Sequence, residues 1–174
     1  LMNERVALGG GVPKQGSGAI GDLVQIWQER KDSMDELSSS VMRDRITELW
    51  IQAEALRLTN WRAREGSKSG NPGPEGSVGK LMSAEMNQKI YELCMEIIGP
   101  EALTFEAGYE RNRAEGSSFA RGSSLKYSFL RSRANTIEGG TSEVMRNILG
   151  ERVLGLPGDV RVDKDVNWVD VPRN

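Results

Sequence analysis

Two glycines directly before a predicted helix form the part of the sequence best suited to binding an anion. Gly139 and Gly140 precede Thr141, Ser142 and Glu143, and Thr141 or Ser142 is a good N-cap residue. Glycines let a bulky ligand approach the backbone closely, and the free N–H groups at a helix N-terminus attract a phosphate or pyrophosphate. The same residues are also consistent with a well-capped helix after a tight turn. They are not a P-loop, because the G-x-x-x-x-G-K-[ST] pattern is missing.

Two glutamates are candidates for acid–base chemistry. Glu4 lies beside Arg5 in the short apolar stretch LMNERVAL, so it is either a buried base or one member of a surface ion pair. Glu138 directly precedes the two glycines, so its carboxylate could face a ligand bound there. Spacing alone does not rank one glutamate above the other. Most Lys and Arg residues are scattered along predicted helices, where we expect them to be solvated.

The composition excludes several other kinds of site. The chain contains no histidine, which removes Ser-His-Asp triads, Cys-His pairs and His-based metal sites, and we predict no metal site. Proton transfer must therefore depend on carboxylates, Lys or Tyr. Cys94 is the single cysteine, so no intrachain disulfide can form and we expect a reducing, cytoplasmic location.

Charge and hydropathy exclude two classes of partner. The chain carries 23 basic and 25 acidic residues, a net charge of −2, which argues against a dedicated nucleic-acid-binding protein. No apolar run approaches the ~18 residues that a membrane span requires. We therefore expect neither a nucleic acid nor a membrane as partner.

Helices must position these residues. The chain of 174 residues is long enough for one domain with one core. Apolar residues recur at helical spacing over residues 19–31, 37–65 and 78–98, and shorter helices are predicted over 123–133 and from Thr141 to about Leu154. In 37–65 the stripe contains Met42, Ile46, Leu49, Ala53, Leu56 and Ala63, with Asn60 as its polar exception. In 78–98 it contains Met82, Met86, Ile90, Leu93 and Ile97.

The segments between these helices are polar or rich in Gly and Pro. Residues 31–40, 66–77 and 101–122 are predicted as breaks or loops, and Gly99-Pro100 ends the helix before it. In the helix over 123–133, Leu125, Phe129 and Leu130 are predicted to point inward. No strand pattern of useful length is visible. The predicted fold is all-α, an antiparallel four-helix bundle with long helices over residues 1–155 and an extended C-terminal tail over 156–174.

Three stretches of the sequence resemble acyl-CoA dehydrogenases. The string RANTIEGGTSEVMRNILGERVLGLP, residues 133–157, resembles the end of that family, where a Gly-Thr-x-[EQ]-x-x-R segment follows a tight turn. GPEGSVGKLMSAEMNQ, residues 73–88, and the entry LMNERVALGG are similar to its bacterial members. The resemblance maps onto the C-terminal helical domain alone. It implies that the N-terminal helical and middle β domains are absent, so we expect a fragment of a longer chain that is inactive by itself.

The resemblance also implies a reaction and a base. The family binds FAD and an acyl-CoA thioester; a glutamate removes a proton from Cα while a hydride leaves Cβ for flavin N5. Many members carry that glutamate directly before the Gly-Thr pair, where this chain has Gly139, which cannot act as a base. A branch similar to isovaleryl-CoA dehydrogenase carries it in a Leu-x-x-Glu-Arg motif, which residues 1–5 match. The resemblance therefore implies that Glu4 is the catalytic base.

The flavin contacts are carried over in part. The resemblance implies that Gly139, Gly140, Thr141 and Glu143 contact FAD. The family's Gln-x-x-Gly-Gly segment, whose Gln reaches the FAD of the partner subunit, corresponds to Glu96-Ile97-Ile98-Gly99-Pro100, so Glu96 takes the place of that cofactor-binding Gln. The family's Arg-x-x-Phe-Gly-Gln element falls at RKDSMDEL, residues 30–37, where that contact is lost.

Two functions follow from these matches and departures. The first is the C-terminal domain of an FAD-dependent acyl-CoA dehydrogenase, acting in fatty acid or lipid degradation and contributing to flavin binding and subunit association. The second is a non-catalytic association domain of a heteromeric acyl-CoA dehydrogenase with a degenerate flavin site. The partners implied are an acyl-CoA substrate and further subunits, in a dimer or tetramer of identical or paralogous chains.

Overall fold

The computed structural model describes residues 13–68, 75–104, 124–158 and 166–171, and these residues form helices and loops without strands. The α-helices are α2 (Ala19–Arg30), α3 (Glu36–Lys68), α4 (Glu75–Ile98), α5 (Leu125–Ser132) and α6 (Ser142–Arg152). Short 3₁₀ turns are η1 (Lys31–Ser33), η2 (Gly99–Leu103), η3 (Arg133–Thr136) and η4 (Trp168–Asp170). The predicted all-α class is confirmed.

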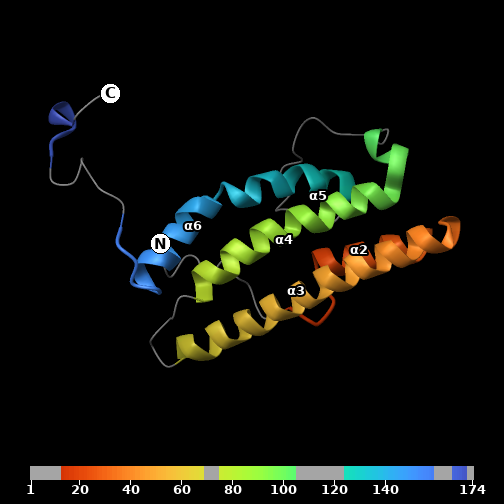
Figure 1. Ribbon diagram of the computed structural model, residues 1–174, viewed down its shortest axis with the longest axis horizontal. Helices are drawn as coiled ribbons and strands as arrows, with labels where there is room; N and C mark the ends of the chain where they lie inside the picture. Colours follow the sequence, from red (N-terminus) through yellow and green to blue (C-terminus); the bar gives the residue numbers. More distant parts are fainter. Residues whose placement is uncertain (1–12, 69–74, 105–123, 159–165, 172–174) are drawn as a thin grey trace, which may run out of the picture.

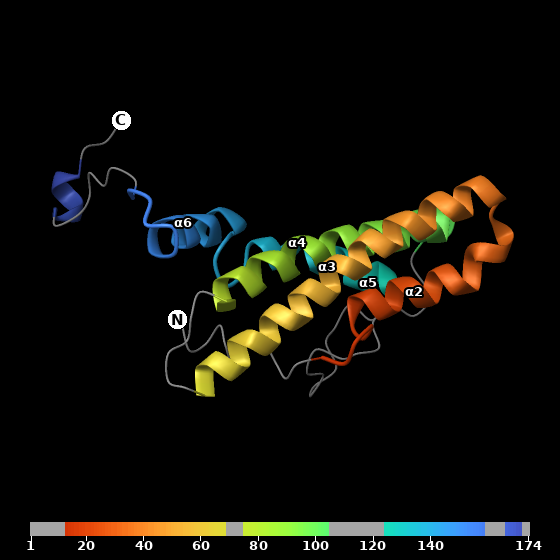
Figure 2. The ribbon, with the colours of Figure 1, turned by 60° about the horizontal axis from the view of Figure 1, so that its bottom comes forward.

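Helix α4 is the centre of the fold. It contacts α2 and α3 on one side, and α5, η3 and α6 on the other (Figures 1 and 2). Helices α3 and α4 each run antiparallel to the helix before them, and α5 and α6 together run back along α4 (Figure 1). The fourth side is thus built from two short helices, so a regular four-helix bundle stays a prediction.

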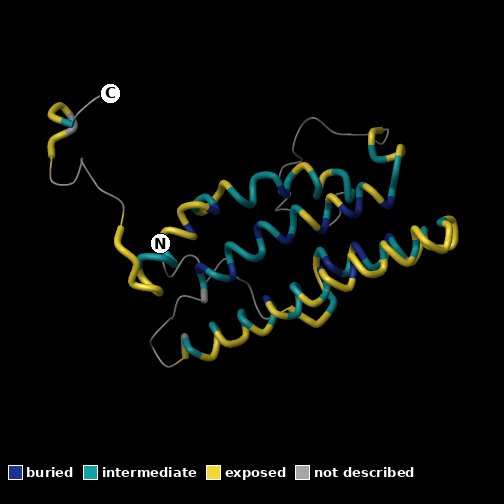
Figure 3. Tube along the Cα trace, viewed as in Figure 1, coloured by how far each residue is buried: buried dark blue, intermediate teal, exposed yellow. Residues whose placement is uncertain are grey.

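The core forms where α4 meets α2 and α3. Ile90, Leu93 and Cys94 of α4 are almost completely buried, as is Leu23 of α2. Helix α3 contributes Ile46, Leu49 and Leu56 from the predicted stripe, and Met42 and Ala53 pack against them. Burying one such side chain contributes about 1.5–3 kcal/mol. The buried positions therefore follow the inner faces of the helices, and the outer face of α3 is exposed (Figure 3).

The start of α3 differs from the prediction. A polar break was expected over residues 31–40, but only η1 and two further residues separate α2 from α3. Asp35 explains the difference, because its carboxylate accepts hydrogen bonds from the backbone N–H of Ser38 at 2.9 Å and from the Ser38 hydroxyl at 2.6 Å. The polar residues that follow Asp35 are the exposed first turns of a capped helix.

One prediction about burial needs correction, and one buried residue was not predicted. Leu130 was expected to point inward, but 52% of it is exposed, because α5 is only eight residues long and turns Ser132 toward α4 instead. On α6 the completely buried residue is Met145, which periodicity did not single out. Residues 156–158 of the predicted tail are exposed and carry no helix. Among the described helices, none has the length and apolarity needed to cross a bilayer.

Candidate functional site

A cavity of about 510 Å³ lies between α4 and the segment that runs from η3 into α6. Two of the predicted flavin contacts, Thr141 and Glu143, are on its wall. The full lining consists of Glu85, Gln88, Lys89, Glu92, Thr136, Ile137, Thr141, Ser142 and Glu143. Eight of these nine residues have polar or charged side chains, and two of them, Ser142 and Glu143, belong to the first turn of α6.

The Gly139–Gly140 turn has a backbone that only glycine adopts easily. The φ angles are +64° at Gly139 and +103° at Gly140, both in the region that disfavours residues with a Cβ. A Cβ at Gly140 would lie 2.6 Å from Cε of Met145, so this glycine serves packing against the buried methionine. A Cβ at Gly139 would have a single neighbour within 4 Å, Cε of Lys80 at 3.9 Å. Gly139 and Gly140, although both are predicted flavin contacts, are not on the cavity wall.

Helix α6 begins with the cap that the sequence predicts. The Thr141 hydroxyl accepts a hydrogen bond from the backbone N–H of Val144 at 3.2 Å. The Glu143 carboxylate accepts hydrogen bonds from its own backbone N–H and from the Thr141 hydroxyl, and these bonds hold its pKa below the usual range. The positive end of the α6 dipole therefore carries a carboxylate of the chain itself.

Side chains from α4 hold this segment in place. The Lys80 ammonium donates a hydrogen bond to the backbone carbonyl of Gly140. Six residues after Gly140, Arg146 of α6 forms an ion pair with Glu85 of α4. The turn and the helix after it are thus fixed to the same face of α4.

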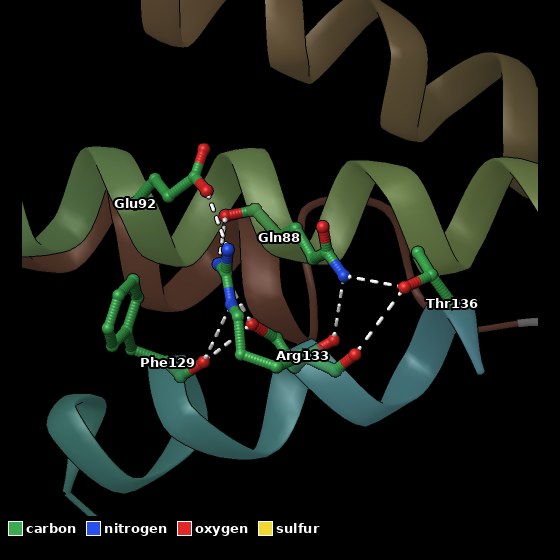
Figure 4. A network of polar contacts seen from close by, with 6 residues as sticks. Gln88, Glu92, Phe129, Arg133 and Thr136 are labelled. Carbon is green, nitrogen blue, oxygen red and sulfur yellow. Dashed lines mark hydrogen bonds and ion pairs between the residues drawn. The ribbon is translucent and has the colours of Figure 1, made fainter. Parts of the chain in front are cut away.

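A polar network fixes η3, the element before the turn (Figure 4). Arg133 donates to the Glu92 carboxylate at 2.7 Å and to the Gln88 carbonyl at 3.4 Å, and its guanidinium lies 4.7 Å from the centre of the Phe129 ring. The Gln88 amide donates to the Thr136 hydroxyl at 2.9 Å. The hydrogen bonds between α4 and η3 cross 41 to 48 residues of sequence, so a single sequence offered no signal for them.

Glu138 lies beside the turn but is not on the cavity wall. Both of its carboxylate oxygens accept hydrogen bonds from Arg131, at 2.9 and 2.8 Å, and one accepts a further bond from the Asn135 amide at 3.0 Å. The bond from Arg131 is the main reason why the pKa of Glu138 lies below its usual value. This carboxylate is occupied by the chain's own donors.

The structure does not bring Glu96 to the cavity. Its carboxylate pairs with the Arg45 guanidinium of α3 at 2.5 Å. A second pair lies between the end of α2 and η2, where Arg30 and Glu101 are 2.6 Å apart. Glu4 lies outside the described residues.

Other reactive groups are unsuited to chemistry at this cavity. Burial raises the pKa of the Cys94 thiol to about 12, and burial together with Asp22 raises the pKa of Tyr91 to about 12. Neither residue is on the cavity wall. Within the described part of the chain, no cluster of three or more acidic, Cys or His side chains could hold a metal ion.

Comparisons with known proteins agree on one family. Residues 1–154 match the family model for the acyl-CoA dehydrogenase C-terminal domain. The chain is 32% identical over 142 residues to the acyl-CoA dehydrogenase IpdE1 of Mycobacterium tuberculosis, covering 82% of this chain and 32% of the relative. It is 28% identical over 163 residues to IpdE1 of Mycolicibacterium smegmatis, covering 90% of this chain and 38% of that relative.

A third relative extends the comparison. The acyl-CoA dehydrogenase FadE34 of Mycobacterium tuberculosis is 31% identical over 159 residues, covering 90% of this chain and 19% of its own length. The chain therefore spans between a fifth and two fifths of the length of these curated relatives. No solved structure matches it.

Proposed function

Because the chain belongs to the acyl-CoA dehydrogenase family, we propose that it is the C-terminal helical domain of an FAD-dependent enzyme that oxidises an acyl-CoA thioester between Cα and Cβ. The observation that carries this proposal is the Gly139–Gly140 turn, which leads into the capped N-terminus of α6 at the wall of the cavity. FAD, when bound, would accept the hydride that leaves Cβ.

The described residues fit the hydroxyl-rich part of a bound dinucleotide in size and in hydrogen bonding. The cavity volume, about 510 Å³, falls among ordinary small-molecule sites. At the first turn of α6, the N–H groups of Glu143 and Val144 already bond within the chain, to the Glu143 carboxylate and to the Thr141 hydroxyl. The α4 wall carries Glu85, Gln88 and Glu92, whose oxygens would accept hydrogen bonds from sugar or ribityl hydroxyls. We therefore expect the hydroxyl-rich part of the cofactor on the α4 side.

The base in this proposal is Glu4. Glycine at position 139 has no side chain to take a proton. The hydrogen bonds of Arg131 and Asn135 to Glu138 stabilise its carboxylate form and oppose its protonation. Glu4 stands in the Leu-x-x-Glu-Arg motif of residues 1–5, and its role as base requires that segment to approach the cavity.

Two observations favour the second function, an association domain without its own flavin chemistry. Glu96 pairs with Arg45, whereas the family has a Gln that reaches the partner's FAD. Residues 30–37 also lack the family's Phe-Gly pair. Such a domain would still bind further subunits, identical or paralogous, through its outer helices.

Flavin reconstitution of the full-length protein separates the two functions. The purified protein is incubated with FAD, freed of unbound cofactor and scanned for flavin absorbance. The proposal predicts stoichiometric flavin that bleaches anaerobically when a fatty acyl-CoA is added. A folded protein that retains no flavin, alone or with a paralogous subunit, would support the association domain instead.

A further inference from the structure

We propose that Lys80 is a positioning residue, which sets the conformation of the Gly139–Gly140 turn and thereby aims the N-terminus of α6 at the cavity. The inference rests on the proposed function, because it concerns the site at which FAD would bind. It assigns a role to a residue of α4 that is 60 positions away from the turn in sequence.

The argument begins with the path of the Lys80 side chain. Lys80 is half-buried near the N-terminal end of α4. Its Cε lies 3.9 Å from the point where a Cβ of Gly139 would be, and its ammonium donates to the Gly140 carbonyl. The side chain therefore runs past one glycine of the turn and ends on the other.

Two adjacent glycines need such a contact. Without Cβ atoms, their φ and ψ angles have a wider range than those of any other residue pair. A hydrogen bond from a charged donor contributes more than one between neutral groups. The hydrogen bond from Lys80 can therefore select one conformation of a turn whose two glycines allow many.

Fixing the Gly140 carbonyl also fixes the N–H that follows it. The carbonyl of Gly140 and the N–H of Thr141 belong to one planar trans peptide and point in opposite directions. With the carbonyl held toward Lys80, the Thr141 N–H points away from the Lys80 ammonium. Thr141 in turn caps α6 through its bond with Val144, so the bond sets the angle at which α6 begins.

The other contacts described around the turn hold the elements on either side of it, whereas Lys80 holds the turn itself. Gln88 and Arg133 hold η3, before the turn, and the Glu85–Arg146 pair holds α6, after it. Lys80 bonds to the backbone of the turn itself. Its ammonium also lies close enough to Glu138 to add to the lowering of that residue's pKa, after the larger effect of Arg131. The positive charge of Lys80 thus lies at the turn.

The test compares four forms of the full-length protein: wild type, Lys80→Met, Lys80→Arg and Lys126→Met. Lys126 is the matched control, because its ammonium also donates to a backbone carbonyl, that of Thr104, at 2.7 Å and away from the cavity. Two quantities are measured: the dissociation constant of FAD after reconstitution of the apoprotein, and amide hydrogen exchange of peptides covering 139–146 and α2–α3.

The expected result is local. Lys80→Met weakens FAD binding roughly tenfold, the worth of one charge-assisted hydrogen bond, and exchange rises in 139–146 but not in α2 or α3. Lys80→Arg restores most of the affinity, and Lys126→Met stays within about twofold of wild type. An affinity of Lys80→Met within twofold of wild type, or unchanged exchange in 139–146, overturns the proposal.

Two complications are covered by the same set of measurements. If Lys80→Met does not fold, Lys80→Arg decides: near-wild-type affinity supports the positioning role, and a folded Lys80→Arg protein with tenfold weaker binding overturns it. If wild type itself binds no FAD, the proposed function fails, and the exchange of 139–146 in the Lys80 variants still decides whether Lys80 sets the turn.

Discussion

At the residue scale, the hydrogen bonds from Arg131 limit the ability of Glu138 to act as a general base. Glu138 stands one position before the place where many family members carry their base, yet its carboxylate receives two hydrogen bonds from Arg131 and one from Asn135. A base must accept a proton readily, and these bonds favour the unprotonated form. Glu4, which lies outside the described residues, stays the proposed base.

A pair of substitutions in the full-length protein tests this assignment. Glu4→Gln is expected to lower the rate of flavin reduction by roughly 10²-fold or more, because it removes general-base catalysis, while FAD stays bound. Glu138→Gln should change the rate far less. Stopped-flow measurement of flavin reduction by a good substrate gives both rates. Loss of reduction in Glu138→Gln but not in Glu4→Gln would move the base to the turn.

Because of the ion pair between Arg131 and Glu138, we expect the free energy of unfolding to depend on pH. The pKa of Glu138 is lower in the folded protein than its ordinary value, so its contribution is present above the unfolded pKa and is lost as pH falls through the folded pKa. Because about half of the Glu138 side chain is exposed, the contribution should be under about 1 kcal/mol. Urea unfolding of wild type and Glu138→Gln should differ at neutral pH and converge in acid. A constant difference across that range would contradict the linkage.

At the scale of single elements, the turn before α6 depends on Gly140. The φ angle of Gly140 is +103°, which disfavours any residue with a Cβ. A Cβ at this position would also lie 2.6 Å from Cε of Met145. Gly140→Ala should therefore lower the free energy of unfolding by about 1–3 kcal/mol. Gly155→Ala is the matched control, since its φ is +66° but nothing lies within 4 Å of its Cβ position. Chemical denaturation of both variants is the measurement, and equal losses would show that packing on Met145 contributes nothing.

An element could be predicted where the residues that determine it lie close together in the sequence. Helix α3 follows from the spacing of Ile46, Leu49 and Leu56, which the structure buries, and the Thr141 cap follows from chemistry within four residues. Leu130 was misplaced because eight residues of α5 give too little periodicity to define a face. Lys80 and Arg133 were not identified as site residues, because their contacts join distant parts of the chain.

At the scale of the whole molecule, α3 has an apolar face that the described residues leave uncovered. Leu37, Val41, Ile51 and Leu58 are between 46% and 75% exposed, and their spacing places them within about 100° around the helix axis. The opposite face of α3 supplies Ile46, Leu49 and Leu56 to the core. A helix with two apolar faces needs two partners, and α4 with α2 provides one.

We expect the second partner to be another subunit, so the full-length protein should form a dimer or tetramer at tens of micromolar, an order of magnitude typical of weak association. Light scattering measures the mass. Ile51→Glu combined with Leu58→Glu should reduce it to a smaller species, because two carboxylates on the apolar face lose their hydration if that face is covered. Leu103→Glu, on η2 and 88% exposed, is the control and should leave the mass unchanged. A monomeric wild-type protein, or a double variant that assembles normally, would mean that α3 does not carry the association.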